Sequence, residues 1–96
     1  MVVSLKKHFT TEKQDLEWCL KELPERKKHV KLIVERINGL INLKKNAKFL
    51  EIGAAQGLSV IAFKELGYEC LGIEPWEDAL KVSKRLAKKL NVRIDI

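Results

Sequence analysis

Two short stretches of this chain combine an acidic residue with glycine at the end of an apolar run. The segment Phe49–Gly57 carries the acid Glu51 and then Gly53 and Gly57, while the run Cys70–Ile73 is followed by Glu74. Glycine lets the backbone turn tightly and approach a ligand closely, and a carboxylate can accept two hydrogen bonds from a vicinal diol such as ribose. A strand, a tight turn, a helix and a second strand with an acid at its tip form the first half of a nucleotide-type site. The order of these parts therefore predicts the binding of a nucleotide-like molecule.

The elements that position these residues follow from hydrophobic periodicity and capping signals. Thr11 and Gln14 form a capping-box pattern at the start of a helix. Pro24 is expected to stop that helix and to begin a second one, which extends to about Ile41. The later pattern predicts two strands, two helices and the start of a third strand, at Lys48–Ile52, Leu58–Leu66, Tyr68–Ile73, Trp76–Leu90 and Val92–Ile96.

Strands that alternate with helices predict parallel pairing through right-handed crossovers. The expected fold is α/β, a three-layer Rossmann-like half fold whose parallel sheet has about three strands in the order 3-2-1. Two helices precede this sheet, so we expect an N-terminal helical segment over 1–44 and a truncated Rossmann-like domain over 45–96. In that arrangement the strand Lys48–Ile52 is an exposed edge, which predicts shielding by a homodimer, a complementing chain or a rearranged N-terminal segment.

The stretch Leu50–Gly57 resembles motif I of the class I S-adenosylmethionine-dependent methyltransferases, whose pattern is acid-x-Gly-x-Gly-x-Gly. Glu51, Gly53 and Gly57 match the acid and the outer glycines, and Ala55 replaces the middle glycine. The segment Gly72–Pro75 resembles the second motif of that family, in which the acid accepts hydrogen bonds from the ribose hydroxyls. The resemblance covers about residues 24–96.

The resemblance implies S-adenosylmethionine as the cofactor and methyl transfer to an unidentified acceptor. It implies that Gly53, Ala55 and Gly57 hold the methionine end, that Glu51 attracts its ammonium group and that Glu74 binds the ribose. Trp76 is expected to pack on adenine or to serve the core. The implied cofactor-binding set is Glu51, Gly53, Ala54, Ala55, Gly57, Glu74, Pro75 and Trp76.

Other functions stay open on the sequence alone. No general base or nucleophile constellation is recognised, so the chain is expected to be the cofactor-binding portion of an enzyme, and no catalytic residue is assigned. The alternative is a non-catalytic or vestigial module that acts through self-association or a partner chain. A lesser alternative is half of an NAD- or FAD-binding domain, although the spacing of Gly53 and Gly57 does not match the Gly-x-Gly-x-x-Gly fingerprint.

Composition narrows the class of protein. Of the 96 residues, 46% are hydrophobic, which suffices for one small core. Neither a long apolar stretch nor a signal-peptide pattern is recognised, so we expect a cytoplasmic protein without membrane association. Two cysteines do not make a disulfide framework or a metal set. The net charge of +6 permits a nucleic-acid partner, but mixed Lys and Glu along helices favour a solvated surface.

Overall fold

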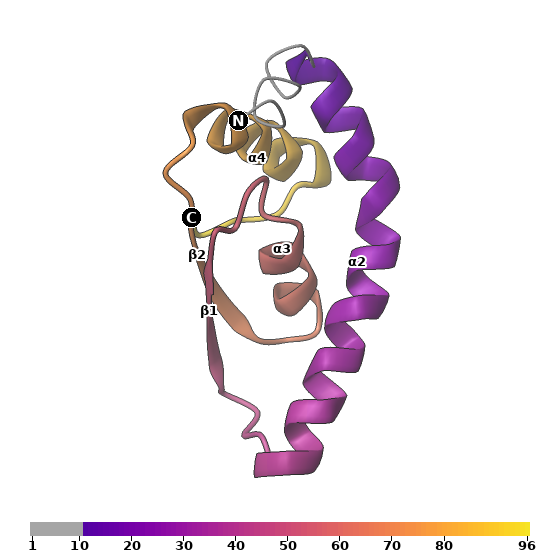
Figure 1. Ribbon diagram of the computed structural model, residues 1–96, viewed down its shortest axis with the longest axis vertical. Helices are drawn as coiled ribbons and strands as arrows, with labels where there is room; N and C mark the ends of the chain where they lie inside the picture. Colours follow the sequence, from indigo (N-terminus) through magenta and orange to yellow (C-terminus); the bar gives the residue numbers. More distant parts are fainter. Residues whose placement is uncertain (1–10) are drawn as a thin grey trace, which may run out of the picture.

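The computed structural model describes residues 11–96 as a mostly helical chain with one small parallel sheet. The elements follow in the order α2 (Glu12–Ile41), β1 (Lys48–Ile52), α3 (Leu58–Glu65), β2 (Glu69–Ile73) and α4 (Glu77–Leu90). Figure 1 shows α3 lying between the strands and the long helix α2, with α4 beyond the carboxyl ends of the strands. The helix expected from Leu58, the strand over Lys48–Ile52 and the strand ending at Ile73 are confirmed, with end shifts of a residue or so.

The prediction of two N-terminal helices is wrong, because α2 is one continuous helix with Pro24 in its interior. Proline removes a backbone hydrogen bond and crowds the preceding turn, so an interior proline normally kinks or ends a helix. Here the helix buries side chains on both sides of Pro24: Leu16, Cys19 and Leu23 pack into the cluster with α3 and α4, and Val30 packs into a second cluster with α3 and the sheet. The packing of these side chains outweighs the tendency of Pro24 to break the helix, and the side chain of Pro24 itself is exposed.

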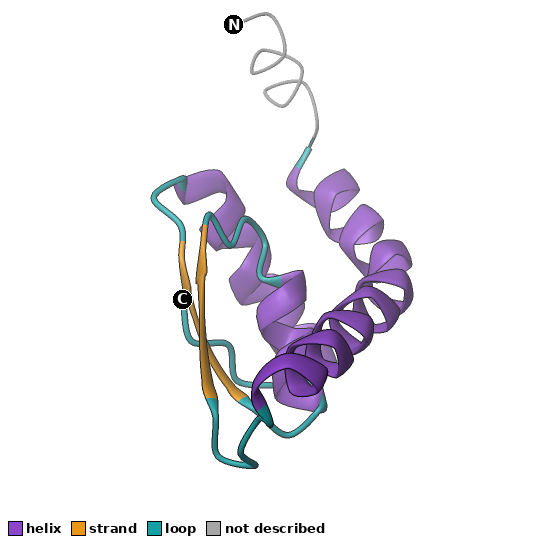
Figure 2. Cartoon of the chain, turned by 60° about the horizontal axis from the view of Figure 1, so that its bottom comes forward, coloured by secondary structure: helices purple, strands orange, loops and turns teal. Residues whose placement is uncertain are grey.

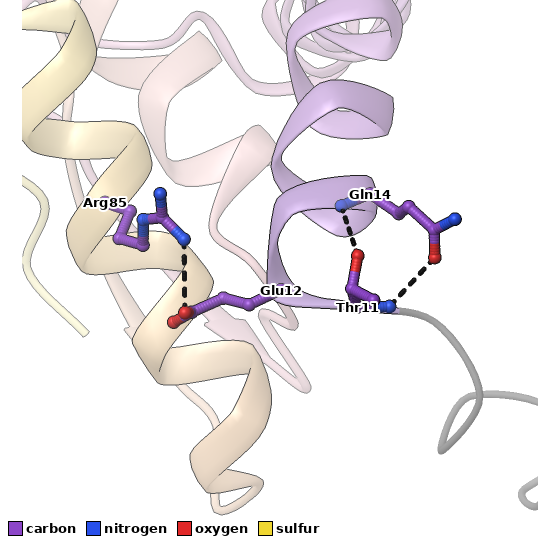
Figure 3. Close-up of polar contacts among 4 residues, drawn as sticks. All are labelled: Thr11, Glu12, Gln14 and Arg85. Atoms are coloured by element: carbon purple, nitrogen blue, oxygen red, sulfur yellow. Dashed lines mark hydrogen bonds and ion pairs between the residues drawn. The ribbon is translucent and has the colours of Figure 1, made fainter.

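Both ends of α2 are capped. The predicted capping box is confirmed, since Thr11 Oγ1 accepts from the Gln14 N–H at 3.0 Å and Gln14 Oε1 accepts from the Thr11 N–H at 2.9 Å (Figure 3). Next to this cap, Arg85 of α4 forms an ion pair with Glu12 at 3.1 Å, which ties the start of α2 to α4. At the other end Asn42 adopts a left-handed conformation, and Asn38 Oδ1 accepts from the Leu43 N–H at 2.8 Å.

The core lies where α3 meets its neighbours. Every side chain of α3 from Leu58 to Phe63 is buried. One cluster joins α3 to α2 and α4, with Leu23, Ile61 and Leu86 among its members. A second cluster joins α3 to α2 and the inner face of the sheet, where Phe49 stacks on Phe63 with ring centroids 4.3 Å apart. Because α3 fills the centre, it fixes the turn that precedes it.

The prediction of a three-stranded Rossmann-like sheet is wrong. Strands β1 and β2 pair in parallel with Lys48 opposite Glu69 and Ile52 opposite Ile73, and they form the only sheet among residues 11–96. The segment expected as a third strand makes one isolated bridge, between Asp95 and Leu71, with the Gly72 N–H donating to the Asp95 carbonyl at 2.8 Å.

The reason lies in the packing of the C-terminal segment. Ile94 and Ile96 pack against the second core cluster, while Arg93 pairs with Asp95 at 3.0 Å. The alternation of apolar and polar residues that indicated a strand is satisfied by this packing without a ladder of backbone hydrogen bonds. The arrangement is also not three-layered, because α2 and α3 lie on one side of the strands and nothing in residues 11–96 covers the other side (Figure 2).

Candidate functional site

The two acidic motifs meet at the carboxyl ends of the parallel strands. The turn between β1 and α3 lies against Glu74, which directly follows β2. Glu74 Oε1 accepts a hydrogen bond from the Ala55 N–H at 2.7 Å, and Oε2 accepts one from the Trp76 N–H at 3.1 Å. One carboxylate therefore connects the first motif, the second motif and the start of α4.

The turn adopts the backbone conformation that its glycines predict. Gly53, Ala55 and Gly57 all have positive φ, at 76°, 50° and 87°. Alanine in this left-handed region is strained by roughly 1–2 kcal/mol, and the hydrogen bond from Ala55 to Glu74 holds it there. The turn therefore takes a left-handed conformation at position 55 with alanine in place of glycine.

Most backbone donors of the turn are already engaged. The N–H groups of Gly53 and Ala54 both donate to the Ile73 carbonyl, at 2.8 and 3.0 Å, and the Gly57 N–H donates to the Ala54 carbonyl at 2.9 Å. A carboxylate at this turn would instead meet the first-turn N–H groups of α3, which have no intrahelical acceptor. Gly53, Ala55 and Gly57 thus shape the turn, and the donors for an anionic group lie further along, at Leu58–Val60. That these three residues hold the methionine end of the cofactor stays a prediction.

The three glycines near the site have different surroundings. A Cβ on Gly53 would meet nothing within 4 Å, so this side of the turn is open to a ligand. A Cβ on Gly57 would lie 2.7 Å from Ile96 Cδ1, so Gly57 makes room for the C-terminal segment. A Cβ on Gly72 would lie 2.7 Å from the Ala54 Cβ and 3.0 Å from Val60 Cγ2. Gly72 therefore lets the turn settle onto β2, a role that sequence reasoning missed although glycine inside an apolar strand signals close backbone approach.

Glu51 lies on the inner face of β1 and points away from the exposed face of the sheet. It lines a groove of about 410 Å³ between β1, α3 and α2, together with Arg26, His29 and Ser59. Its Oε2 atom is buried and has no hydrogen-bond partner. Burial raises the pKa of the Glu51 carboxyl above its ordinary value, and the nearby Arg26 charge and Ser59 hydroxyl oppose that rise.

Arg26 is the residue of this groove that sequence reasoning did not connect with the motif. Its Nη1 donates to Ser59 Oγ at 3.0 Å, which holds the guanidinium beside β1. A cation next to a half-buried carboxylate compensates part of its charge. Glu51 thus retains an unpaired buried oxygen in a groove where a donor or cationic group would be stabilised.

The remaining predicted residues lie at the start of α4. Pro75 is exposed, and Trp76 is half-buried at the N-cap position with φ −81° and ψ 112°. Trp76 contributes its backbone N–H to Glu74. That its indole packs on adenine or serves the core stays a prediction.

Residues 11–96 contain no group of three or more His, Cys, Asp or Glu side chains arranged to hold a metal ion. Both cysteines are buried free thiols, and burial is the main cause that raises the pKa of Cys19 to about 11. A thiol with such a pKa is a poor nucleophile at neutral pH. No helix over the same residues is long and apolar enough to cross a bilayer.

Comparison with known proteins adds no family assignment. No protein-family model matches the chain, and no curated protein matches it significantly. The chemistry of the site must therefore be argued from its own residues.

Proposed function

We propose that this chain binds S-adenosylmethionine where β1 and β2 end, and that it serves as the cofactor-binding portion of a methyltransferase with an unidentified acceptor. The observation that carries the proposal is the hydrogen bond from the Ala55 N–H to Glu74 Oε1, at 2.7 Å. It brings the glycine turn of one motif and the acid of the other into one site. In open α/β sheets, ligands bind at the carboxyl ends of the parallel strands.

The residues present fit such a ligand at its ribose. A carboxylate has about four lone-pair positions, and the hydrogen bonds of Glu74 with the Ala55 and Trp76 N–H groups use one on each oxygen. The remaining positions suit two ribose hydroxyl donors, because Glu74 is only partly buried. Its side chain is also held in place before the ligand arrives, which lowers the entropy cost of binding.

Three features are candidates to hold the methionine end: the turn, the first turn of α3, and the groove that Glu51 lines. The open side of Gly53 allows close approach, and the first turn of α3 offers free N–H groups and the positive end of the helix dipole to a carboxylate. The unpaired oxygen of Glu51 suits an ammonium group. When bound, S-adenosylmethionine supplies an electrophilic methyl group, and this chain's residues would hold and orient it.

Calorimetric titration with S-adenosylmethionine, with NAD as the comparison ligand, tests the proposal. Saturable binding of S-adenosylmethionine and weaker binding of NAD are expected. Glu74→Gln replaces one acceptor oxygen by a donor and should weaken binding by about tenfold or more, since a hydrogen bond to a charged group contributes about 1.5–3 kcal/mol. Glu77→Gln is the matched control, because Glu77 is exposed at the start of α4 and changes the net charge equally.

Circular dichroism of both variants separates loss of binding from loss of fold. Absence of saturable binding at millimolar S-adenosylmethionine, by a chain shown to be folded, would contradict the proposal. Equal weakening by Glu77→Gln would show that charge alone, and not the site, governs binding. Tighter binding of NAD would favour a dinucleotide half domain.

A second candidate function is a non-catalytic module that acts through association. The observation that favours it is the uncovered side of the sheet, where Leu50, Ile52, Leu71 and Ile73 are exposed. In addition, β1 pairs only with β2 among the described residues, so its outer edge is open to a complementing strand. This candidate needs no cofactor, and titration with S-adenosylmethionine distinguishes the two.

A further inference from the structure

One face of the two-stranded sheet is apolar and has no cover in the described part of the chain. Side chains alternate along each strand, and the residues that point away from α3 include Leu50 and Ile52 of β1 and Leu71 and Ile73 of β2. Their exposed fractions are 58%, 79%, 51% and 48%. Figures 1 and 2 both show α3 and α2 on the opposite side of the strands. Parallel sheets are almost always covered on both faces, so this face is a candidate interface.

The charges on this open face are arranged at its margin. Lys48 and Glu69 lie side by side at the start of the two strands and form an ion pair at 3.6 Å, with both side chains 78% exposed. Beside β2, Arg93 pairs with Asp95. An apolar centre with a polar rim is the usual anatomy of a protein interface. The charges of each pair cancel, so the net charge of the chain is not concentrated here.

The register of the strands makes this face complementary to itself. Its cross-strand neighbours are Lys48 with Glu69, Leu50 with Leu71, and Ile52 with Ile73. A twofold axis that runs parallel to the strands, between two such faces, keeps each residue at its height and places β1 of one copy opposite β2 of the other. Lys48 then faces Glu69 of the second copy, Leu50 faces Leu71, and Ile52 faces Ile73. Opposite charges meet at one end, and aliphatic side chains meet along the rest.

We propose that two copies of this chain associate face to face through Leu50, Ile52, Leu71 and Ile73, with reciprocal pairs between Lys48 and Glu69 at the margin. The two sheets would lie about 10 Å apart with nearly aligned strands, as in other packed sheets. The contact is isologous and closes as a dimer. It lies on the face opposite α2 and α3, so neither of these helices has to move.

Face-to-face packing of two copies is favoured over strand pairing at the β1 edge for a physical reason. Edge pairing would extend the sheet but would leave the apolar face of both copies in water. Face packing removes the apolar residues of both copies from water, which is the main source of association free energy. The proposal does not depend on cofactor binding, because the face and the strand ends are separate surfaces.

Sedimentation equilibrium of the full chain over a range of concentrations, without cofactor, measures the association. A monomer–dimer equilibrium is expected. Ile52→Lys should weaken it by on the order of 100-fold or more, because the symmetry places the substitution in the contact twice. Leu40→Lys is the matched control, since Leu40 of α2 is also 79% exposed and lies outside the face; it should leave the equilibrium within about twofold.

Charge exchange tests the orientation of the two copies. Lys48→Glu and Glu69→Lys should each weaken the dimer, because each places like charges opposite one another. The double variant should recover the wild-type association. It should not pair with the wild-type chain, because Lys48 of one would face a lysine at position 69 of the other.

A strict monomer at high concentration would overturn the proposal, whatever segment covers the face instead. A dimer that survives Ile52→Lys, or that is lost in Leu40→Lys, would also overturn it, since another surface would then carry the contact. Free mixing of the double variant with the wild-type chain would refute the proposed axis. Recovery in the double variant, with exclusion of the wild-type chain, would support both surface and orientation. The outcome is independent of titration with S-adenosylmethionine, so the two proposals succeed or fail separately.

Discussion

The contact of the β1–α3 turn with Gly72 gives a sharp test of how this site is held together. Replacing Gly72 by alanine would place a Cβ 2.7 Å from the Ala54 Cβ, 3.0 Å from Val60 Cγ2 and 3.2 Å from Ile96 Cγ1. The Ala54 methyl is fixed to its backbone and cannot rotate away. The turn must therefore move off β2, and it carries the Ala55 N–H away from Glu74.

The expected change in unfolding free energy on Gly72→Ala follows from two opposed effects. Overpacking of this kind destabilises a core by about 1–3 kcal/mol, while glycine-to-alanine exchange at an unstrained position stabilises by roughly 0.5–1 kcal/mol. The expected net loss is about 1–2 kcal/mol of unfolding free energy. Since a domain of this size has about 5–15 kcal/mol in total, the loss is easily measured by urea titration followed by circular dichroism.

Two further variants make the test specific. Gly39→Ala is the same chemical change in α2, where a Cβ would meet nothing within 4 Å; it should stabilise by about 0.5–1 kcal/mol. Ala54→Gly removes the closest methyl group, so the double variant with Gly72→Ala should lose less than the sum of the single variants, with a coupling of about 1 kcal/mol. Wild-type stability in Gly72→Ala, or additivity in the double variant, would refute the claim that this contact positions the turn.

Two other predictions concern the partly buried carboxyl group of Glu51 and the proline inside α2, Pro24. Burial raises the pKa of Glu51 in the folded chain, so the folded state holds the Glu51 proton more tightly than the unfolded state does. The stability that this proton contributes is therefore complete below the ordinary pKa of 4.5, and it is lost as the pH rises through the raised pKa. Glu51→Gln should therefore be more stable than the wild type at pH 7, with the advantage vanishing below about pH 4.5; urea titrations at pH 4, 5.5 and 7 check this, and a pH-independent difference would argue against the burial of that charge. Pro24→Ala should raise the unfolding free energy by about 2 kcal/mol, because it restores a hydrogen bond inside α2 and removes a ring clash, less the entropy gained by the unfolded chain. A lower thermal midpoint in Pro24→Ala would instead show that a proline-shaped bend is needed for packing.

The local elements of the site could be predicted from sequence because short-range chemistry determines them. Thr11 and Gln14 form their capping box within one turn of helix. The apolar run Lys48–Ile52 is a strand, and the glycines at 53 and 57 take the positive φ that their residue type permits.

Pro24 and the C-terminal segment show where local rules were overridden. Pro24 predicts a break, yet α2 continues because buried side chains before it pack against α3 and α4, and Val30 after it packs against α3 and the sheet. Val92–Ile96 alternates as a strand does, yet Ile94 and Ile96 pack against the core and only Asp95 bridges to β2. In both cases contacts between distant residues outweigh a preference of about 1–3 kcal/mol per position.

The sequence by itself determined the types of residue at the site, the turn between them and the acids at the strand ends, because these depend on neighbours along the chain. Only the tertiary structure decided which groups remain free to bind. It assigned the N–H groups of Gly53 and Ala54 to the Ile73 carbonyl and brought Arg26 beside Glu51. It also left one face of the sheet without a cover from residues 11–96. These outcomes follow from how α2, α3 and the strands pack together, and packing between segments far apart in the chain is not encoded in any local pattern.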